Sequence, residues 1–376
     1  MHADLPPPSL EEAAHSERLA TLIRGEIANA GGMLDFARYM ELALYAPGLG
    51  YYSAGAAKFG AAGDFITAPE LGFIFARCLA RAVAPVLADV GGGDILELGP
   101  GSGALAADLL LELERLGALP LRYRLLERSA DLRARQRETL QQRCTHLAVD
   151  IEWMDAPPLE PWRGVLVANE VIDALPVRLF ALRETGLYAR AVAVDERGGF
   201  AWREGEADAA LREAVAAAIG ERGETLPQPY FSEVCPWLSP WLVEVTRSLE
   251  SGNVLFADYG YADGEYYAAT RRTGTLRCHY RHRAHDDPLV LTGLQDITAW
   301  VDFDALARAG AGAGFEIAAH ATQGQFLIAH GLDEVFGEAY ANASDEAARY
   351  ALAQQVKRLT LPDEMGERFR VMALRR

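Results

Sequence analysis

The most constraining feature of this sequence is a short apolar run that enters a glycine-rich turn and continues as a helix. The run DILELG covers residues 94–99, and ALAADLLLELERLG follows the turn with helical spacing of its apolar residues. A strand, turn and helix of this kind begin a βαβ unit, in which free N–H groups at the start of the helix face a bound ligand. A glycine turn without a ligand is the alternative. The turn residues are Gly99, Pro100, Gly101, Ser102 and Gly103.

The strand–helix alternation continues along the chain and predicts a doubly wound α/β sheet with helices on both faces. The expected later strands cover residues 122–128, 146–155, 163–170, 253–260, 315–322 and 369–376, and the expected later helices cover 130–144, 301–314 and 332–356. Together with 94–99, the strands number seven, as in a Rossmann-like class I methyltransferase sheet that is mostly parallel with an antiparallel last strand.

The chain divides into four expected segments. Residues 1–88 contain helices and a glycine- and aromatic-rich loop that covers the site, and residues 89–180 form the first part of the α/β core. Residues 181–250 break the alternation with a hairpin and an alanine-rich helix, so we expect an inserted lobe there. Residues 251–376 complete the core.

Charge and cysteine usage restrict the partners. The net charge of −17 argues against nucleic acid, because phosphate contacts require clustered Lys and Arg. Four scattered cysteines without a CxxC pair suit a reducing compartment, and no apolar run is long enough for a membrane span. The acidic, proline-containing start also lacks the pattern of a signal peptide. We therefore expect a soluble cytoplasmic protein with no membrane partner.

Two cofactors fit the glycine turn, since Gly99, Gly101 and Ala104 also match the dinucleotide pattern G-x-G-x-x-A. Glu97 favours S-adenosylmethionine, because a carboxylate would repel a pyrophosphate and attract the methionine ammonium. Glu127 ends the second strand and is expected to bond both ribose hydroxyls, which would suit NAD almost as well; a solvated charge is the alternative. Asp155 follows the third strand and is expected near the adenine amino group, with a plain loop position as the alternative.

The segment GVLVANEVIDALPVRLF places polar residues at the end of the fourth strand, where a sheet of this type borders its cofactor. Asn169, Glu170 and Asp173 are costly to bury without partners, so we expect them to face the transferred group.

At this point the sequence resembles a known family, the MidA-type methyltransferases, which include the mitochondrial complex I assembly enzyme that methylates a protein arginine. The resemblance covers nearly the whole chain and departs at Ala130, where proline is expected. The matching segments are LDFARYMELALYAPGLGYY, GDFITAPELG, ELGPGSGALAADLL, ANEVIDALPV, ADYGY, GTLRCHYRHRAHDDPL, LQDITAWVDF, TQGQFL and LPDEMGERFRVMAL.

The resemblance implies S-adenosylmethionine as the cofactor and a protein arginine as the acceptor, with a respiratory-complex subunit as one possible client. It also implies that Gly63, Asp64 and Thr67 help to close the cofactor site. An arginine acceptor requires carboxylates that hold the guanidinium and receive a proton. Glu170 and Asp173 are the expected catalytic pair, with Asn169, Glu70 and Asp258 as further members.

Three alternatives stay open: an NAD-dependent oxidoreductase, a non-catalytic assembly factor that binds a client protein, and a methyltransferase for a small molecule. His279, His282 and His285 form a histidine-rich run, but its arginines disfavour a metal ion and no metal is expected. Tyr51 and Tyr52 are expected either to shape a substrate channel or to pack in the interior.

Overall fold

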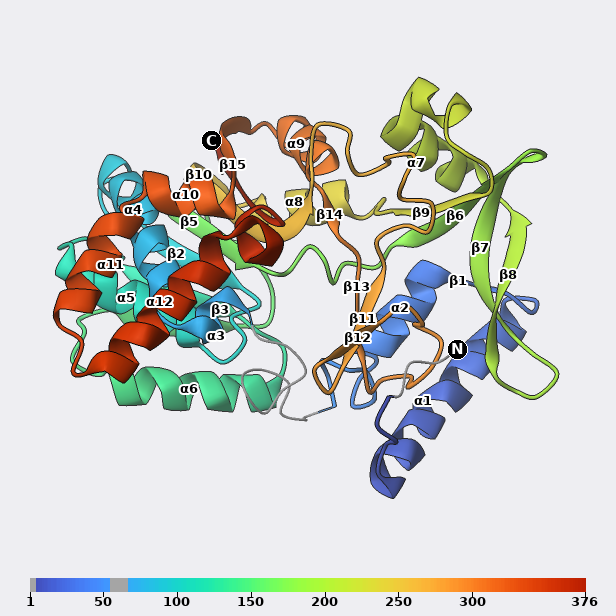
Figure 1. The fold of residues 1–376 in the computed structure, drawn as a ribbon, viewed down its shortest axis with the longest axis horizontal. Coiled ribbons are helices and arrows are strands. Elements are labelled where there is room, and N and C mark those ends of the chain that lie inside the picture. The colour runs from blue at the N-terminus through green and yellow to red at the C-terminus, as the bar shows by residue number, and fades with distance from the viewer. Residues whose placement is uncertain (1–4, 55–66) are drawn as a thin grey trace.

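The structure, a computed structural model, describes residues 5–54 and 67–376, and a mixed sheet of eight strands forms the core of the part drawn at the left of Figure 1. Its order is β15-β16-β10-β5-β2-β3-β4, and the short β14 pairs with β10. Neighbours from β10 to β4 run parallel, whereas β16 is antiparallel to both β10 and β15. The predicted Rossmann-like class I sheet is therefore confirmed. The strands are β2 (Asp94–Leu98), β3 (Arg122–Leu126), β4 (Asp150–Met154), β5 (Trp162–Asn169), β10 (Leu249–Tyr261), β14 (Val301–Asp302), β15 (Glu316–Thr322) and β16 (Phe369–Arg375).

Helices cover both faces of this sheet because its strands are apolar on both sides. Buried side chains of one face pack with α4 (Ile74–Asp89), α5 (Ala104–Arg115), α6 (Ala130–Cys144), α10 (Gln323–Ala329), α11 (Leu332–Ala341) and α12 (Glu346–Thr360). The other face packs with α8 (Leu238–Thr246) and α9 (Phe303–Gly312). None of the helices in residues 5–54 and 67–376 is both long enough and apolar enough to cross a bilayer.

The C-terminal helix expected over residues 332–356 is two helices. α11 ends at Ala341, and α12 begins after Asp345, whose side chain accepts a hydrogen bond from the Ala348 N–H group. Small polar residues in ANASD satisfy free backbone groups at helix ends better than they extend a helix, which explains the break. Between α12 and β16, the turn η2 (Pro362–Gly366) returns the chain to the central sheet.

A second, antiparallel sheet joins the N-terminal part of the chain to the middle part (Figure 1). Its order is β1-β7-β6-β9, with β8 paired to β7. One face packs with α1 (Leu10–Asn29) and α2 (Phe36–Tyr45), and the other packs with α7 (Ala209–Ile219), which continues into η1 (Gly220–Glu224). Its strands are β1 (Leu34–Asp35), β6 (Arg178–Arg183), β7 (Gly186–Val194), β8 (Phe200–Glu206) and β9 (Tyr230–Val234). The division of the chain at residues 88, 180 and 250 stays a prediction.

A small three-stranded sheet lies between these two parts and contributes a wall of the site described below. It consists of β11 (Arg277–Tyr280), β12 (Arg283–His285) and β13 (Asp296–Thr298), in the order β12-β11-β13. The β11–β12 turn has Arg281 and His282 at φ values of 48° and 60°, the left-handed conformation of a two-residue hairpin turn. Arg281 also forms an ion pair of 2.8 Å with Glu12 on α1, so the turn is attached to the N-terminal helix.

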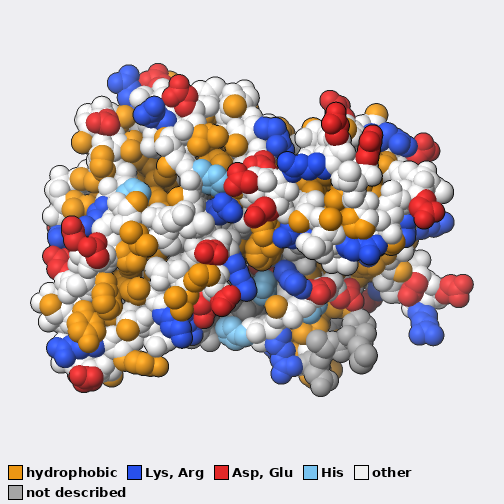
Figure 2. All heavy atoms as spheres, turned by 45° about the horizontal axis from the view of Figure 1, so that its top comes forward, with side chains coloured by type: hydrophobic (Ala, Val, Ile, Leu, Met, Phe, Trp, Pro, Cys, Tyr) orange, Lys and Arg blue, Asp and Glu red, His pale blue; other side chains and the backbone are white. Residues whose placement is uncertain are grey.

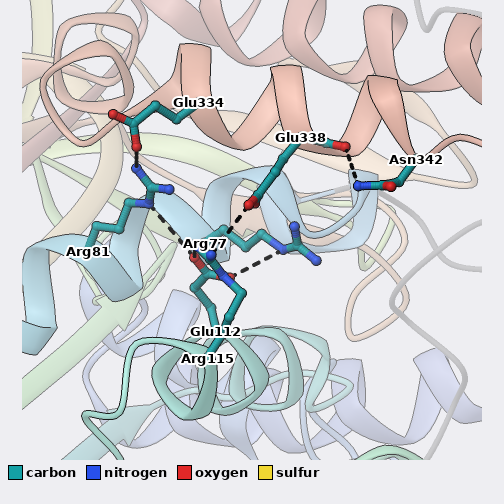
Figure 3. Close-up of polar contacts among 7 residues, drawn as sticks. All are labelled: Arg77, Arg81, Glu112, Arg115, Glu334, Glu338 and Asn342. Atoms are coloured by element: carbon teal, nitrogen blue, oxygen red, sulfur yellow. Dashed lines mark hydrogen bonds and ion pairs between the residues drawn. The ribbon is translucent and has the colours of Figure 1, made fainter.

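A cluster of ion pairs around one buried carboxylate, that of Glu112, connects the core helices α4, α5 and α11 (Figure 3). Glu112 on α5 is 2% exposed and lies 2.7 Å from Arg115, 3.6 Å from Arg77 and 3.8 Å from Arg81. Arg81 also contacts Glu334 on α11 at 2.6 Å. Three arginines thus compensate one buried carboxylate, and their ion pairs link the three helices. On the molecular face shown in Figure 2, acidic and basic side chains are interspersed rather than gathered by sign.

Candidate active site

A cavity of about 1090 Å³ opens at the carboxyl ends of β2, β3 and β5. This is the edge where the order of the strands reverses, since β2 has β3 on one side and β5 on the other, and ligands of doubly wound sheets bind there. Fourteen of the predicted site residues lie in the described part of the chain, and eleven of them line the cavity. The predicted residues that line it are Thr67, Glu70, Glu97, Gly99, Pro100, Gly101, Ser102, Glu127, Asn169, Glu170 and Asp173.

The glycine turn has backbone conformations that residues with a Cβ atom adopt only with strain. Gly99, Gly101 and Gly103 have φ values of 60°, 53° and 82°, in the left-handed region that glycine enters at little cost. Gly103 does not line the cavity; it precedes α5, and a Cβ atom there would lie 3.2 Å from the Cα atom of Gln136. The turn therefore directs the start of α5 toward the cavity and allows α6 to pack closely behind it.

Glu97 brings a buried carboxyl group to the cavity from β2. It is 2% exposed and accepts a hydrogen bond of 2.7 Å from the Tyr123 hydroxyl. Burial raises the pKa of Glu97 to about 7, because a carboxylate loses the solvation of water there. A cationic ligand group in the cavity would restore the charged form, so Glu97 is suited to an ammonium group.

Glu127 lies at the end of β3 and lines the same cavity. Its carboxylate accepts a hydrogen bond of 2.8 Å from the Ser129 N–H and one of 3.3 Å from the Gln136 amide, and burial raises its pKa. Asp155 does not line the cavity. Its side chain is 81% exposed and pairs with Arg133, whose Nε donates to the Glu127 carbonyl at 2.6 Å.

The last residue of β5 and the segment after it present an amide and two carboxyl groups. Glu170 has a φ of 52°, a strained value for a residue with a side chain, and such strain concentrates at functional sites. The Asn169 amide donates to Glu170 at 3.2 Å. Burial, followed by the charge of Asp173, raises the pKa of Glu170 to about 8. Asp173 is 6% exposed, and burial raises its pKa to about 6.

One carboxyl oxygen of Asp173 accepts a hydrogen bond, and the other has no partner in the described structure. Its Oδ2 accepts a hydrogen bond of 2.6 Å from the Tyr259 hydroxyl, whereas its Oδ1 and the Oδ1 of Asn169 are buried without a hydrogen-bond partner in the described structure. Buried acceptors are almost always satisfied in native proteins. These two oxygens therefore indicate where a donor group of a ligand would bind.

Asp258 supports this segment from behind and does not line the cavity. Its Oδ2 accepts hydrogen bonds from the N–H groups of Val171, Ile172 and Asp173 at 3.2, 3.0 and 3.3 Å, and its Oδ1 accepts one from Tyr259 at 2.9 Å. Burial, together with the nearby carboxylates, raises the pKa of Asp258, and the N–H donors oppose that rise. Its position suits backbone anchoring rather than substrate contact.

The N-terminal part of the chain reaches the cavity through α3 (Ala68–Leu71). Thr67 directly precedes this helix and lines the cavity, and Glu70 accepts a hydrogen bond from the Ser102 hydroxyl in the glycine turn. Gly63 and Asp64 lie outside the described residues.

Of the two interpretations of Tyr51 and Tyr52, Tyr52 fits the channel and Tyr51 the interior, whereas Tyr45 and Asp296 were not predicted as residues of the cavity. Tyr52 lines the cavity and donates a hydrogen bond of 2.9 Å to Asp296 on β13, which is 3% exposed. The Tyr45 ring stacks on Tyr52 with centroids 5.5 Å apart, and its hydroxyl donates to the Ala174 carbonyl at 2.9 Å. Tyr51 is buried and does not line the cavity. An acid inside the apolar run LQDITAW was the one available signal for Asp296.

The histidine-rich run does not converge on one point. His279 on β11 lines the cavity, whereas His282 occupies the exposed β11–β12 turn. Within residues 5–54 and 67–376, no three His, Cys, Asp or Glu side chains gather as a metal ion would require.

The comparison with protein families identifies the fold and site together. The profile of a family described as S-adenosyl-L-methionine-dependent methyltransferase matches residues 78–320, more than half of the chain. The chain belongs to this methyltransferase family. The predicted MidA-type family and the cofactor S-adenosylmethionine are thereby confirmed, and the oxidoreductase alternative receives no support.

Individual relatives agree with this assignment. A mouse relative, named protein arginine methyltransferase NDUFAF7, mitochondrial, is 30% identical, with 96% of this chain and 86% of the relative covered. The human protein of the same name is 29% identical, with 91% and 80% covered. A crystal structure from Burkholderia thailandensis, bound to S-adenosyl-homocysteine, is 44% identical with a TM-score of 0.93, and the match covers 99% of this chain and 95% of the other.

The expectation of a cytoplasmic protein is contradicted, because the curated relatives are named as mitochondrial proteins. That expectation rested in part on scattered cysteines, which indicate a reducing environment. Such cysteines do not distinguish one reducing compartment from another, and the expectation is withdrawn.

The residues of the cavity fit S-adenosylmethionine. Glu97 is a buried carboxyl group that an ammonium would stabilise in its charged form, and Glu127 presents a carboxylate that can accept hydrogen bonds from ribose hydroxyls. S-adenosylmethionine is the cofactor of this methyltransferase family. The cavity offers one carboxyl group that suits its ammonium and another that suits its ribose hydroxyls.

Proposed function

We propose that this methyltransferase transfers a methyl group to a guanidinium nitrogen of an arginine side chain on a client protein. The observation that supports the proposal most strongly is the pair Glu170 and Asp173, a partly buried and a buried carboxyl group next to the carboxyl end of β5. The unpartnered Asp173 Oδ1 is an acceptor available to a guanidinium N–H. A subunit of a respiratory complex is a candidate client.

The charge of the cavity supports a cationic acceptor. Nine carboxyl-bearing residues line it, against three arginines. A cleft in which one sign of charge predominates concentrates ligands of the opposite sign. The nine are Glu70, Glu97, Glu127, Asp131, Glu170, Asp173, Asp296, Asp363 and Glu364, and the three are Arg128, Arg277 and Arg368.

The reaction requires an oriented nucleophile and a place for one proton. When bound, S-adenosylmethionine supplies a methyl carbon that positive sulfur has already activated. Glu170 and Asp173 hold the guanidinium so that one nitrogen points at this carbon. As the new C–N bond forms and the S–C bond breaks, the nitrogen loses a proton to Asp173 Oδ1, and the products are methylarginine and S-adenosylhomocysteine. Tyr259 and Asp258 keep Asp173 in position through the hydrogen bonds described above.

Labelled methyl transfer from S-adenosylmethionine to proteins of a deletion-strain lysate tests the proposal. We expect label on a protein, recovered as methylarginine after acid hydrolysis. Glu170→Gln should abolish transfer while S-adenosylhomocysteine still binds in calorimetry, and the exposed Glu196→Gln serves as the matched control. Label on lysine or on a small molecule would refute the arginine acceptor, and cofactor binding without any transfer would support the non-catalytic assembly factor.

A further inference from the structure

One face of α6 makes hydrogen bonds, from outside the cavity, to the glycine turn and to the end of β3. The side chains involved are Arg133, Gln136 and Thr139, which follow one another at intervals of three residues and therefore share one side of the helix. None of these three lines the cavity. Their partners are the glycine turn, which carries Gly101 and Ser102, and the end of β3, which carries Glu127.

Gln136 is the centre of this arrangement, and it is completely buried. Its amide nitrogen donates to the Gly101 carbonyl at 2.9 Å and to Glu127 Oε2 at 3.3 Å, and its amide oxygen accepts from the Trp153 indole at 2.9 Å. Both N–H donors and the oxygen thus have partners of the correct polarity, which fixes the orientation of the amide. A carboxylate would lack the two donors, and an apolar side chain would lack all three groups.

Arg133 and Thr139 extend the same contacts to either side. Arg133 Nε donates to the Glu127 carbonyl at 2.6 Å, and the Thr139 hydroxyl donates to the Ser102 carbonyl at 2.9 Å. In a trans peptide the C=O group and the following N–H group point in opposite directions. Because the Gly101 carbonyl faces α6, the N–H of Ser102, a residue that lines the cavity, points away from α6.

We infer that Gln136 is a positioning residue for the cofactor, because it holds the Glu127 carboxylate and the glycine turn in one fixed geometry from behind the site. Glu127 needs a defined orientation if its two oxygens are to accept hydrogen bonds from neighbouring ribose hydroxyls. The Gln136 N–H group occupies one lone pair of Oε2 and thereby limits the rotation of the carboxylate. This inference concerns the cofactor and does not depend on the identity of the acceptor.

Binding of S-adenosylhomocysteine, measured by calorimetry on the full chain, tests the inference. Gln136→Leu removes the hydrogen-bond partner of the Gly101 carbonyl, of Glu127 Oε2 and of the Trp153 indole, and we expect its Kd to rise about tenfold or more. Gln136→Glu places a second carboxyl group beside Glu127, so only its protonated form can donate to that carboxylate. The ratio of its Kd to the wild-type Kd should therefore be at least about fivefold higher near pH 8 than near pH 6.

Two further variants keep the test decisive. Gln141→Glu makes the same substitution at an exposed position of α6, and its Kd should stay within about twofold of wild type at both pH values. Thr139→Val removes only the hydroxyl bonded to Ser102 and should weaken binding by about two- to fivefold, which gives a second measurement if Gln136→Leu does not fold. A folded Gln136→Leu protein with unchanged affinity would overturn the inference. So would a Gln136→Glu protein whose Kd relative to wild type does not change with pH, because a purely structural role predicts no such change.

Discussion

Glu97→Gln is expected to make the ligand-free protein more stable at alkaline pH and less able to bind its cofactor. In the folded protein burial raises the pKa of Glu97 from 4.5 to about 7. A carboxyl group whose pKa is raised by folding keeps its proton in the folded state over a pH range in which the unfolded chain has already lost it. Stability is therefore lost as the pH rises from about 4.5 to about 7, and the loss is complete above that range.

The magnitude follows from the two pKa values. The destabilisation amounts to about 0.8 kcal/mol near pH 5 and about 3 kcal/mol near pH 8. Glutamine has the same shape and no charge, and its amide oxygen can still accept the hydrogen bond from the Tyr123 hydroxyl. The free energy of unfolding of Glu97→Gln should thus exceed that of wild type by roughly 2 kcal/mol more near pH 8 than near pH 5.

Urea denaturation of both proteins at the two pH values measures this difference, and all other titrating groups cancel in the comparison. Calorimetry on the same samples should show that S-adenosylhomocysteine binds at least about tenfold more weakly to Glu97→Gln, because the ammonium loses its charged partner. A stability difference that is the same at both pH values would refute the burial argument. An unchanged Kd would refute the assignment of Glu97 to the ammonium group.

Three further outcomes are expected. Asp258→Asn should lower the free energy of unfolding, measured by urea denaturation, by about 2 kcal/mol. Its NH2 group replaces one of two oxygens that accept hydrogen bonds from backbone N–H groups, so donor would face donor. Equal stability would contradict the anchoring role. Tyr52→Phe should reduce methyl transfer about five- to tenfold, with the Kd for S-adenosylhomocysteine unchanged, since Asp296, a carboxyl group of the cavity that we assign to the acceptor, loses a donor; a change in cofactor affinity without a change in transfer would refute that assignment. The kcat/KM for the acceptor should rise with pH between about 6 and about 8, where Asp173 and Glu170 ionise, and initial rates that fall over this range would contradict the carboxylate clamp.

Much of the core and of the cofactor side follows from local sequence. The apolar run at 94–98 and the glycines after it predict β2, its turn and α5, because strand burial and left-handed φ values leave direct marks on residue type. Glu97 and Glu127 follow from their positions at strand ends, and both line the cavity. The same reasoning predicted one C-terminal helix in place of α11 and α12, because a short capping sequence is easily taken for part of a helical pattern.

The sequence by itself determined seven of the eight strands of the sheet, the place of its glycine turn and the polar residues that follow the apolar part of β5. Only the tertiary structure decided what each polar residue contacts. Tyr52 bonds Asp296 across 244 positions in the sequence, Asp258 turns its carboxylate to the backbone after β5, and Asp155 points outward to Arg133. Gln136 has no sequence signal at all, since a glutamine on a polar helix becomes buried only when that helix packs behind the glycine turn. Backbone conformation is encoded by near neighbours, whereas the partner of a side chain depends on the packing of segments that are distant in the chain.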